Sequence, residues 1–139
     1  MSKPTNPRSD FLHALLQCDH AETRELGWAI GSSPLLSDAP EQHLLSPDFF
    51  DENWRERMDW LLSIDTSTER LNHLRTSLNS GSQRLGKRFE RLVTYWFESH
   101  PRWTVEKSNW VVSDAKRTIG EFDLIALNND TGAYWHFEL

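Results

Sequence analysis

The sequence of 139 residues has a single cysteine, Cys18, so no disulfide forms within the chain. A lone cysteine is typical of proteins from a reducing compartment, where structural disulfides are rare. The opening MSKPTNPRSD lacks the apolar core of a secretory signal, and no apolar run is long enough to span a bilayer. We therefore expect a soluble, cytoplasmic protein.

Basic residues are missing from the end of the sequence. Residues 118–139 hold four acidic side chains and no lysine or arginine, whereas residues 84–117 hold eight basic and four acidic side chains. Residues 1–83 hold seven basic and 13 acidic ones, and the net charge of −6 argues against a simple polyanion binder. A positive stretch followed by clustered carboxylates is what a phosphate-handling metal site requires, although an ordinary solvated surface gives the same pattern.

Large aromatic side chains are plentiful, with seven tryptophans and seven phenylalanines, which excludes a disordered chain. The length suits one compact domain. Its first part, residues 1–83, shows apolar residues at helical spacing in four stretches. They are residues 12–16, 24–30, 51–64 and a helix opened by a capping box at Thr66-Ser67-Thr68-Glu69 with the stripe Leu71, Leu74 and Leu78. We expect Trp28, Trp54 and Trp60 in the core, and no metal-ligand spacing links the histidines here.

The second part, residues 84–139, begins with one strongly patterned helix. Its buried stripe is expected to be Leu85, Phe89, Leu92, Val93 and Trp96, and His100-Pro101 ends it. Glu90 adjoins the stripe and either faces inward or pairs with Lys87 or Arg91 on the helix surface.

Three strands are expected next, at residues 103–112, 118–128 and 133–139, the last two joined by a turn at 129–132. Burying the apolar side chains of both strands on one face pairs Phe122 with Leu139, Leu124 with Phe137 and Ala126 with Trp135. The opposite face then carries Asp123 directly across from Glu138, together with Glu121 and His136.

Directly opposed carboxylates repel each other and destabilise a sheet, and a divalent cation between them removes the repulsion. Magnesium is held by one or two carboxylates plus waters and phosphate oxygens, so Asp123 and Glu138 form a candidate magnesium or manganese site. The alternative is that one or both carboxylates simply face solvent. A satisfied sheet histidine is the expected role of His136.

The segment GEFDLIALNNDTGAYWHFEL resembles the central hairpin of the PD-(D/E)XK nuclease superfamily. Together, RELGWAIGSSPLL, RLGKRFERLV and GEFDLIAL…HFEL resemble a bacterial family known only as a domain of unknown function, DUF1853, over about residues 24–139. The resemblance implies a restriction-endonuclease-like α/β core in an α+β chain, with helices first and then a helix and a three-stranded, mainly antiparallel sheet. It also implies a magnesium-dependent nuclease in which Asp123, Glu138 and Glu90 are catalytic, with Glu121 secondary.

Nucleic acid is the partner that this resemblance implies. The basic residues expected to follow its backbone are Arg84, Lys87, Arg88, Arg91, Lys116 and Arg117. The lysine of the superfamily's E-x-K motif does not follow Glu138, because the sequence ends at Leu139. We therefore expect a fragment of a longer protein, with its sheet incomplete at the C-terminus and inefficient in catalysis.

Two other readings stay open. In one, the chain keeps the nuclease fold but is inactive, and binds nucleic acid or a protein. In the other, it is a structural interaction domain whose helical half contacts a partner, and the acids are incidental. A glycosidase fits less well, because the two carboxylates are close together and lie next to a basic stretch.

Overall fold

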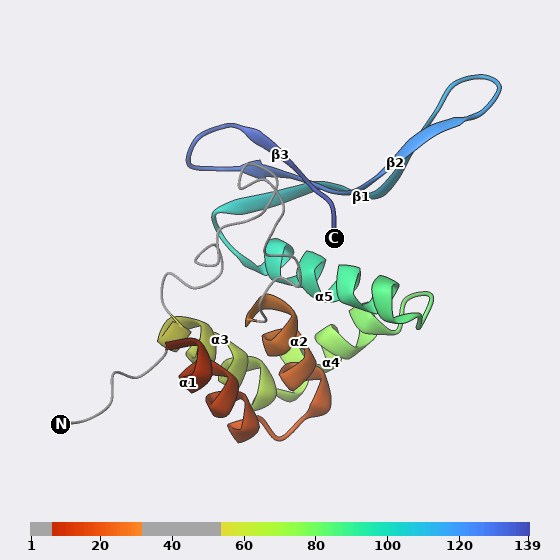
Figure 1. Ribbon diagram of the computed structural model, residues 1–139. Coiled ribbons are helices and arrows are strands. Elements are labelled where there is room, and N and C mark those ends of the chain that lie inside the picture. The colour runs from red at the N-terminus through yellow and green to blue at the C-terminus, as the bar shows by residue number, and fades with distance from the viewer. Residues whose placement is uncertain (1–6, 32–53) are drawn as a thin grey trace. The chain divides into compact units, whose positions relative to one another are not determined.

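The computed structural model describes residues 7–31 and 54–139, and Figure 1 shows the order of their elements. Five α-helices precede a three-stranded antiparallel sheet that does not close, which confirms the α+β class. The chain divides into two compact units, residues 1–76 and 77–139, each described separately below. The boundary predicted between residues 83 and 84 stays a prediction. Within the described residues, no helix is both long and apolar enough to cross a bilayer.

The first unit consists of short helices. They are α1 (Pro7–Ala14), the 3-10 turn η1 (Leu15–Gln17), α2 (Ala21–Gly31), α3 (Trp54–Asp65) and α4 (Thr68–Leu78). The first helix starts at a proline, because proline has the helical φ and lacks an N–H that would go unbonded there. Predicted helical residues 51–53 lie outside the described residues.

The core of the first unit is made of aliphatic side chains from all its helices. Fully buried members are Leu26, Leu61, Ile64 and Leu74, beside Phe11 at 1% exposure. The expectation for Trp28 was wrong, because its side chain is 54% exposed; Leu16 is 74% exposed. The buried contacts of α2 are instead made by Gly27, which lies against Leu15 of η1, and Gly31, which lies against Phe11 of α1.

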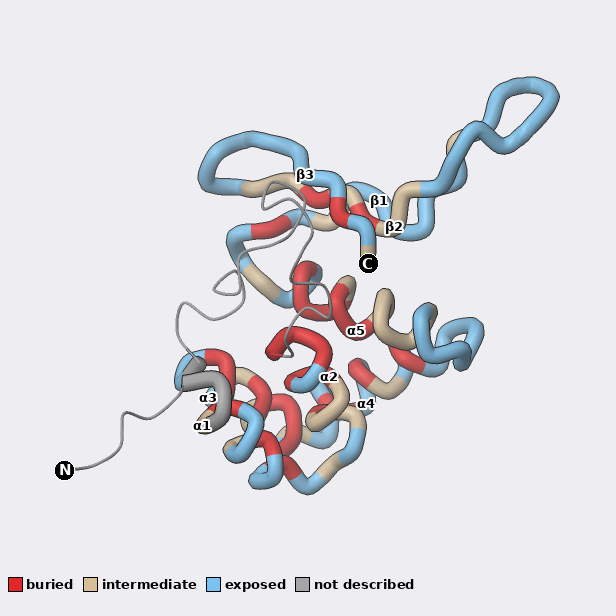
Figure 2. The backbone as a smooth tube through the Cα atoms, viewed as in Figure 1, coloured by how far each residue is buried: buried red, intermediate tan, exposed pale blue. Residues whose placement is uncertain are grey.

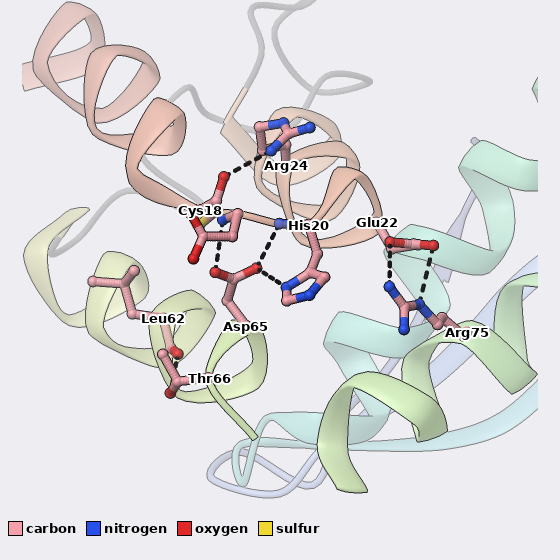
Figure 3. Close-up of polar contacts among 9 residues, drawn as sticks. Cys18, His20, Glu22, Arg24, Leu62, Asp65, Thr66 and Arg75 are labelled. Atoms are coloured by element: carbon pink, nitrogen blue, oxygen red, sulfur yellow. Dashed lines mark hydrogen bonds and ion pairs between the residues drawn. The ribbon is translucent and has the colours of Figure 1, made fainter. Parts of the chain in front are cut away.

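Asp65, the last residue of α3, connects that helix to the start of α2 (Figure 3). Its carboxylate accepts the backbone N–H groups of Asp19 at 2.8 Å and His20 at 3.0 Å, and lies 3.1 Å from His20 Nδ1. Desolvation acts to raise the pKa of Asp65, but these hydrogen bonds outweigh it and hold the pKa below its ordinary value. A buried carboxylate thereby provides partners for N–H groups that precede a helix.

The predicted capping box of α4 is replaced by a simpler cap. Ser67 Oγ accepts the N–H of Arg70, whereas the Thr66 hydroxyl donates back to the carbonyl of Leu62. The helix therefore begins one residue after a serine cap and two after Thr66. Its stripe of Leu71, Leu74 and Leu78 is buried as predicted.

The second unit opens with α5 (Leu85–Ser99), which ends before His100-Pro101 as predicted. Leu92, Val93, Trp96 and Phe97 are buried, but Leu85 is 81% exposed. Phe97 packs on Trp103 and Phe137 of the sheet, at ring-centroid distances of 5.3 Å and 4.8 Å. The apolar stripe is thus buried where α5 packs on the sheet, whereas Leu85 lies in the first turn of the helix, which the sheet does not cover.

The sheet has the order β1 (Trp103–Ser113), β2 (Thr118–Asn128) and β3 (Tyr134–Phe137). Leu124 pairs with Phe137 and Ala126 with Trp135, which confirms the predicted register. Gly132, at φ 72°, donates its N–H to the carbonyl of Asn128 and closes the predicted turn. The third strand is shorter than predicted, because the ladder stops at Phe137.

One face of the β2–β3 pair is buried as predicted. Leu124, Ala126 and Phe137 are at most 5% exposed. Trp135 was predicted to be buried on this face, but its side chain is 42% exposed because it lies on an outer strand. Its ring meets Trp103 edge to face and stacks on Phe137.

Candidate metal centre

Two elements of the second unit bring acidic side chains together. Glu90 projects from the second turn of α5, and Glu121 and Asp123 belong to β2. The ammonium of Lys87, one turn before Glu90, lies 3.0 Å from Glu90 Oε2 and 3.3 Å from its Oε1. The same ammonium is 3.8 Å from Glu121 Oε1, so a single cation joins the helix acid to a strand acid.

Lys87 is therefore surrounded by acceptors. Its ammonium also donates to Asn109 Oδ1 at 3.2 Å. The hydrogen bond to Glu90 raises the pKa of Lys87 above its ordinary value, and the charges of Glu121 and Asp123 act in the same direction. Glu90 is thus the partner of Lys87, which was one of the two placements expected for it, and its side chain is only 14% exposed.

Asp123 does not share a ladder pair with Glu138. The ladder stops one residue earlier, and Asp123 Oδ2 instead accepts the backbone N–H of Leu139 at 2.9 Å. A side-chain carboxylate has replaced a strand carbonyl as the acceptor, which is a common way for aspartate to end regular pairing. Asp123 and the backbone around Glu138 are nonetheless adjacent, as the register predicted.

The side chain of Glu138 pairs with His136, two residues earlier in the chain. Its Oε1 lies 2.5 Å from His136 Nε2, and both side chains are accessible to solvent, at 66% and 40%. The His136 ring also meets Phe122 edge-on at 4.6 Å. The satisfied sheet histidine expected from the sequence is what the described structure contains, with Glu138 as its partner.

Across residues 7–31 and 54–139, no three histidine, cysteine, aspartate or glutamate side chains converge in a way that would hold a metal ion. Glu90 is bonded to Lys87, Glu138 to His136 and Asp123 to a backbone N–H. The carboxylates are hard oxygen donors of the kind magnesium binds. Binding one ion by Asp123 and Glu138 together requires the Glu138 side chain to leave His136.

The basic residues predicted to bind nucleic acid fall into separate groups. Arg88 donates to Gln83 Oε1 at 3.0 Å, and Arg91 donates to the carbonyl of Ser82, so both bond to the segment before α5. Arg84 is the exposed N-cap residue of that helix. Lys116 and Arg117 lie far along the β1–β2 connection, in the exposed turn closed by Asp114. Lys87 is in neither group, because its ammonium pairs with Glu90 and lies near Glu121.

A family model described as a domain of unknown function, DUF1853, matches residues 24–139. The chain belongs to this family. The match covers the last helices of the first unit and all of the second, including every acid named above. No curated protein and no solved structure matches the chain.

Two features of the site were not predicted. Asn109 has a left-handed backbone, φ 50°, and is an acceptor for Lys87. Asparagine tolerates this conformation better than most residues, which is the only local signal that the sequence offers. The placement of Lys87 depends on how α5 packs against β1 and β2, and the spacing of residues within α5 does not encode that.

Proposed function

We propose that this chain is part of a magnesium-dependent phosphodiesterase of the PD-(D/E)XK type that acts on nucleic acid. The observation that carries the proposal is the position of the Lys87 ammonium, which bonds to Glu90 and lies 3.8 Å from Glu121, with the charge of Asp123 also acting on it. Carboxylates that already neutralise one cation suit a divalent cation, because magnesium binds carboxylate oxygens. The confirmed hairpin register, which brings Asp123 next to residues 138 and 139, supports the same assignment.

The residues fit a magnesium or manganese ion by donor type. Asp123 and Glu138 are the proposed ligands, with Glu90 completing the set and Glu121 near it. A bound divalent ion supplies an activated water and neutralises charge that develops on a phosphodiester. The carboxylate of Asp123 is held in place by the N–H of Leu139, so its orientation is set before any ligand arrives.

Two other side chains have secondary roles in this proposal. Lys87 holds Glu90 near Glu121, and His136 holds Glu138 until the cation is bound.

The test is a cleavage assay on the protein with supercoiled DNA and with labelled RNA, in magnesium and in excess chelator. Wild type is expected to cut one of them only with metal present. Asp123→Asn should abolish cleavage, whereas Asp130→Asn, an exposed turn carboxylate bonded to Arg102, should leave it intact. Cleavage that survives Asp123→Asn would refute the assignment.

A second function is favoured by the ion pairs themselves. Glu90 is neutralised by Lys87 and Glu138 lies against His136, so the fold has polar partners for its acids without any metal. An inactive nuclease-fold module that binds nucleic acid or a protein fits these contacts. Binding that is unchanged by chelator, with no cleavage at any pH, would identify it.

A further inference from the structure

The β1–β2 hairpin continues well beyond the rest of the sheet. We call residues 110–120 the arm; they comprise the ends of β1 and β2 and the turn between them. The third strand pairs only with Leu124–Leu127, so the arm is a two-stranded ribbon with no neighbour in its sheet. Figure 1 shows it projecting past α5 and β3, and in Figure 2 nearly all of its residues are coloured as exposed.

The arm carries large apolar side chains that are exposed to solvent. Trp110 is 42% exposed, Val111 is 51% exposed and Ile119 is 65% exposed. An isolated two-stranded ribbon is marginally stable in water, and grouped exposed apolar residues mark contact surfaces. The rings of Trp110 and Phe122 are tilted by 31° and their centroids lie 5.8 Å apart at the base of the arm.

The charge on the arm is positive in a chain whose net charge is −6. Lys116 and Arg117 lie in its turn, and the ammonium of Lys107 lies 5.9 Å from the ring of Trp110. Asp114 is the only acid of the arm, and its carboxylate accepts the backbone N–H groups of Lys116 and Arg117, at 2.8 Å and 3.0 Å. The turn therefore presents two cations at its end and uses its one anion internally.

The dimensions of the arm match one kind of nucleic-acid groove. Four residues of strand, 110 to 113, span roughly 13 Å at about 3.4 Å each. The major groove of B-form DNA is about 12 Å wide and about 8.5 Å deep and admits a two-stranded ribbon. The major groove of A-form RNA is too deep and narrow for side chains to read. Because side chains on both faces of the ribbon are exposed, each face can contact one wall of the groove.

We propose that the arm docks in the major groove of duplex DNA, with Lys116 and Arg117 on phosphates and Trp110 and Ile119 against base edges. This inference rests on the proposed function and specifies its substrate as duplex DNA. Phosphate contacts give affinity and position, and the apolar side chains contact groups such as the thymine methyl. The acids around Lys87 adjoin the base of the arm, since Lys87 contacts Asn109 and Glu121 there.

The test is fluorescence anisotropy of a labelled 20-base-pair DNA duplex, titrated with the protein in chelator so that no cleavage occurs. Affinity is measured from 50 to 200 mM salt. Lys116→Gln with Arg117→Gln is expected to reduce the slope of log affinity against log salt by about 2, roughly 1 for each phosphate contact. Trp110→Ala is expected to weaken binding about tenfold at an unchanged slope.

The control removes the same charge elsewhere. Arg70→Gln with Arg102→Gln neutralises two arginines that lie outside the arm and should leave the slope unchanged. The Lys116 and Arg117 changes keep the apolar strand residues and the backbone bonds to Asp114, so the arm stays folded in that variant.

The proposal would be overturned by no duplex binding by wild type, by equal slopes for the arm and control variants, or by duplex RNA bound as tightly as duplex DNA. A dimer that forms only with an intact arm, without DNA, would assign the arm to protein contact and overturn it too. Absence of cleavage in magnesium bears only on the proposed function, because binding is measured without metal.

Discussion

Lys87 and Glu121 approach to 3.8 Å between Nζ and Oε1, which links the first turn of α5 to the middle of β2. The same ammonium bonds both oxygens of Glu90. These acids are therefore held together by a lysine side chain in the absence of metal. If the proposed metal site is correct, a bound metal ion competes with the Lys87 ammonium for Glu90.

Removing the Lys87 charge should tighten metal binding. Lys87→Met is expected to raise the affinity for Mn²⁺ about fivefold, because it deletes a positive charge that pairs with Glu90 and lies 3.8 Å from Glu121. The raised pKa of Lys87 keeps it charged throughout neutral pH, so its competition with metal, and the difference between the two proteins, should persist up to at least pH 9. Isothermal titration calorimetry checks both points.

The matched control is Lys107→Met, which removes an equal charge from β1, where the ammonium lies over Trp110. It should leave the Mn²⁺ affinity nearly unchanged. Weaker metal binding in Lys87→Met than in wild type would mean that Lys87 organises the ligands more than it competes.

Asp65 should stabilise the first unit in a pH-dependent way. Its folded pKa is depressed, so its contribution is present above the unfolded value of about 3.9 and is lost as pH falls through the folded one. Asp65→Asn is expected to lower the free energy of unfolding by about 2 kcal/mol at pH 7, since charged hydrogen bonds are lost. The difference from wild type should shrink toward pH 3.

Urea denaturation at several pH values measures this difference. Asp59→Asn on the same helix is the control, because that side chain is exposed. A gap between wild type and Asp65→Asn that is constant from pH 7 to pH 3 would rule out the charged form of Asp65 as its source.

Two helical glycines should respond to alanine in opposite directions. A Cβ at Gly31 would lie 2.1 Å and 2.7 Å from ring atoms of Phe11, which is itself buried, so Gly31→Ala should cost about 2 kcal/mol. At Gly86 nothing lies within 4 Å, and Gly86→Ala should stabilise α5 by about 0.5 kcal/mol. Thermal melts of both variants compare the two. Equal effects would mean that the α1–α2 contact is looser than described.

Much of the sheet follows from side-chain alternation. The pairing of Leu124 with Phe137 was predicted because a slip of one residue puts polar groups in the core. The turn at 129–132 followed from its length and from Gly132. Helix ends marked by proline, such as His100-Pro101, were predicted for the same local reason.

Contacts between elements were harder to predict. The exposure of Leu85 and Trp28 depends on which part of each helix finds a neighbour, and periodicity alone does not give that. The contacts of Asp123 and Glu138 depend on which nearby group each carboxylate meets. Asp123 accepts the backbone N–H of Leu139, and Glu138 pairs with His136. The sequence indicates these acids as candidates, whereas packing determines their contacts.

The most direct test of the central claim is calorimetric titration of Mn²⁺ into wild type, Asp123→Asn and the control Asp130→Asn. A site built on Asp123 and Glu138 predicts one saturable event in wild type and in Asp130→Asn, and its loss in Asp123→Asn. Glu138→Gln should weaken it as well, since both carboxylates are proposed ligands. The same Mn²⁺ affinity in Asp123→Asn as in wild type would contradict the account.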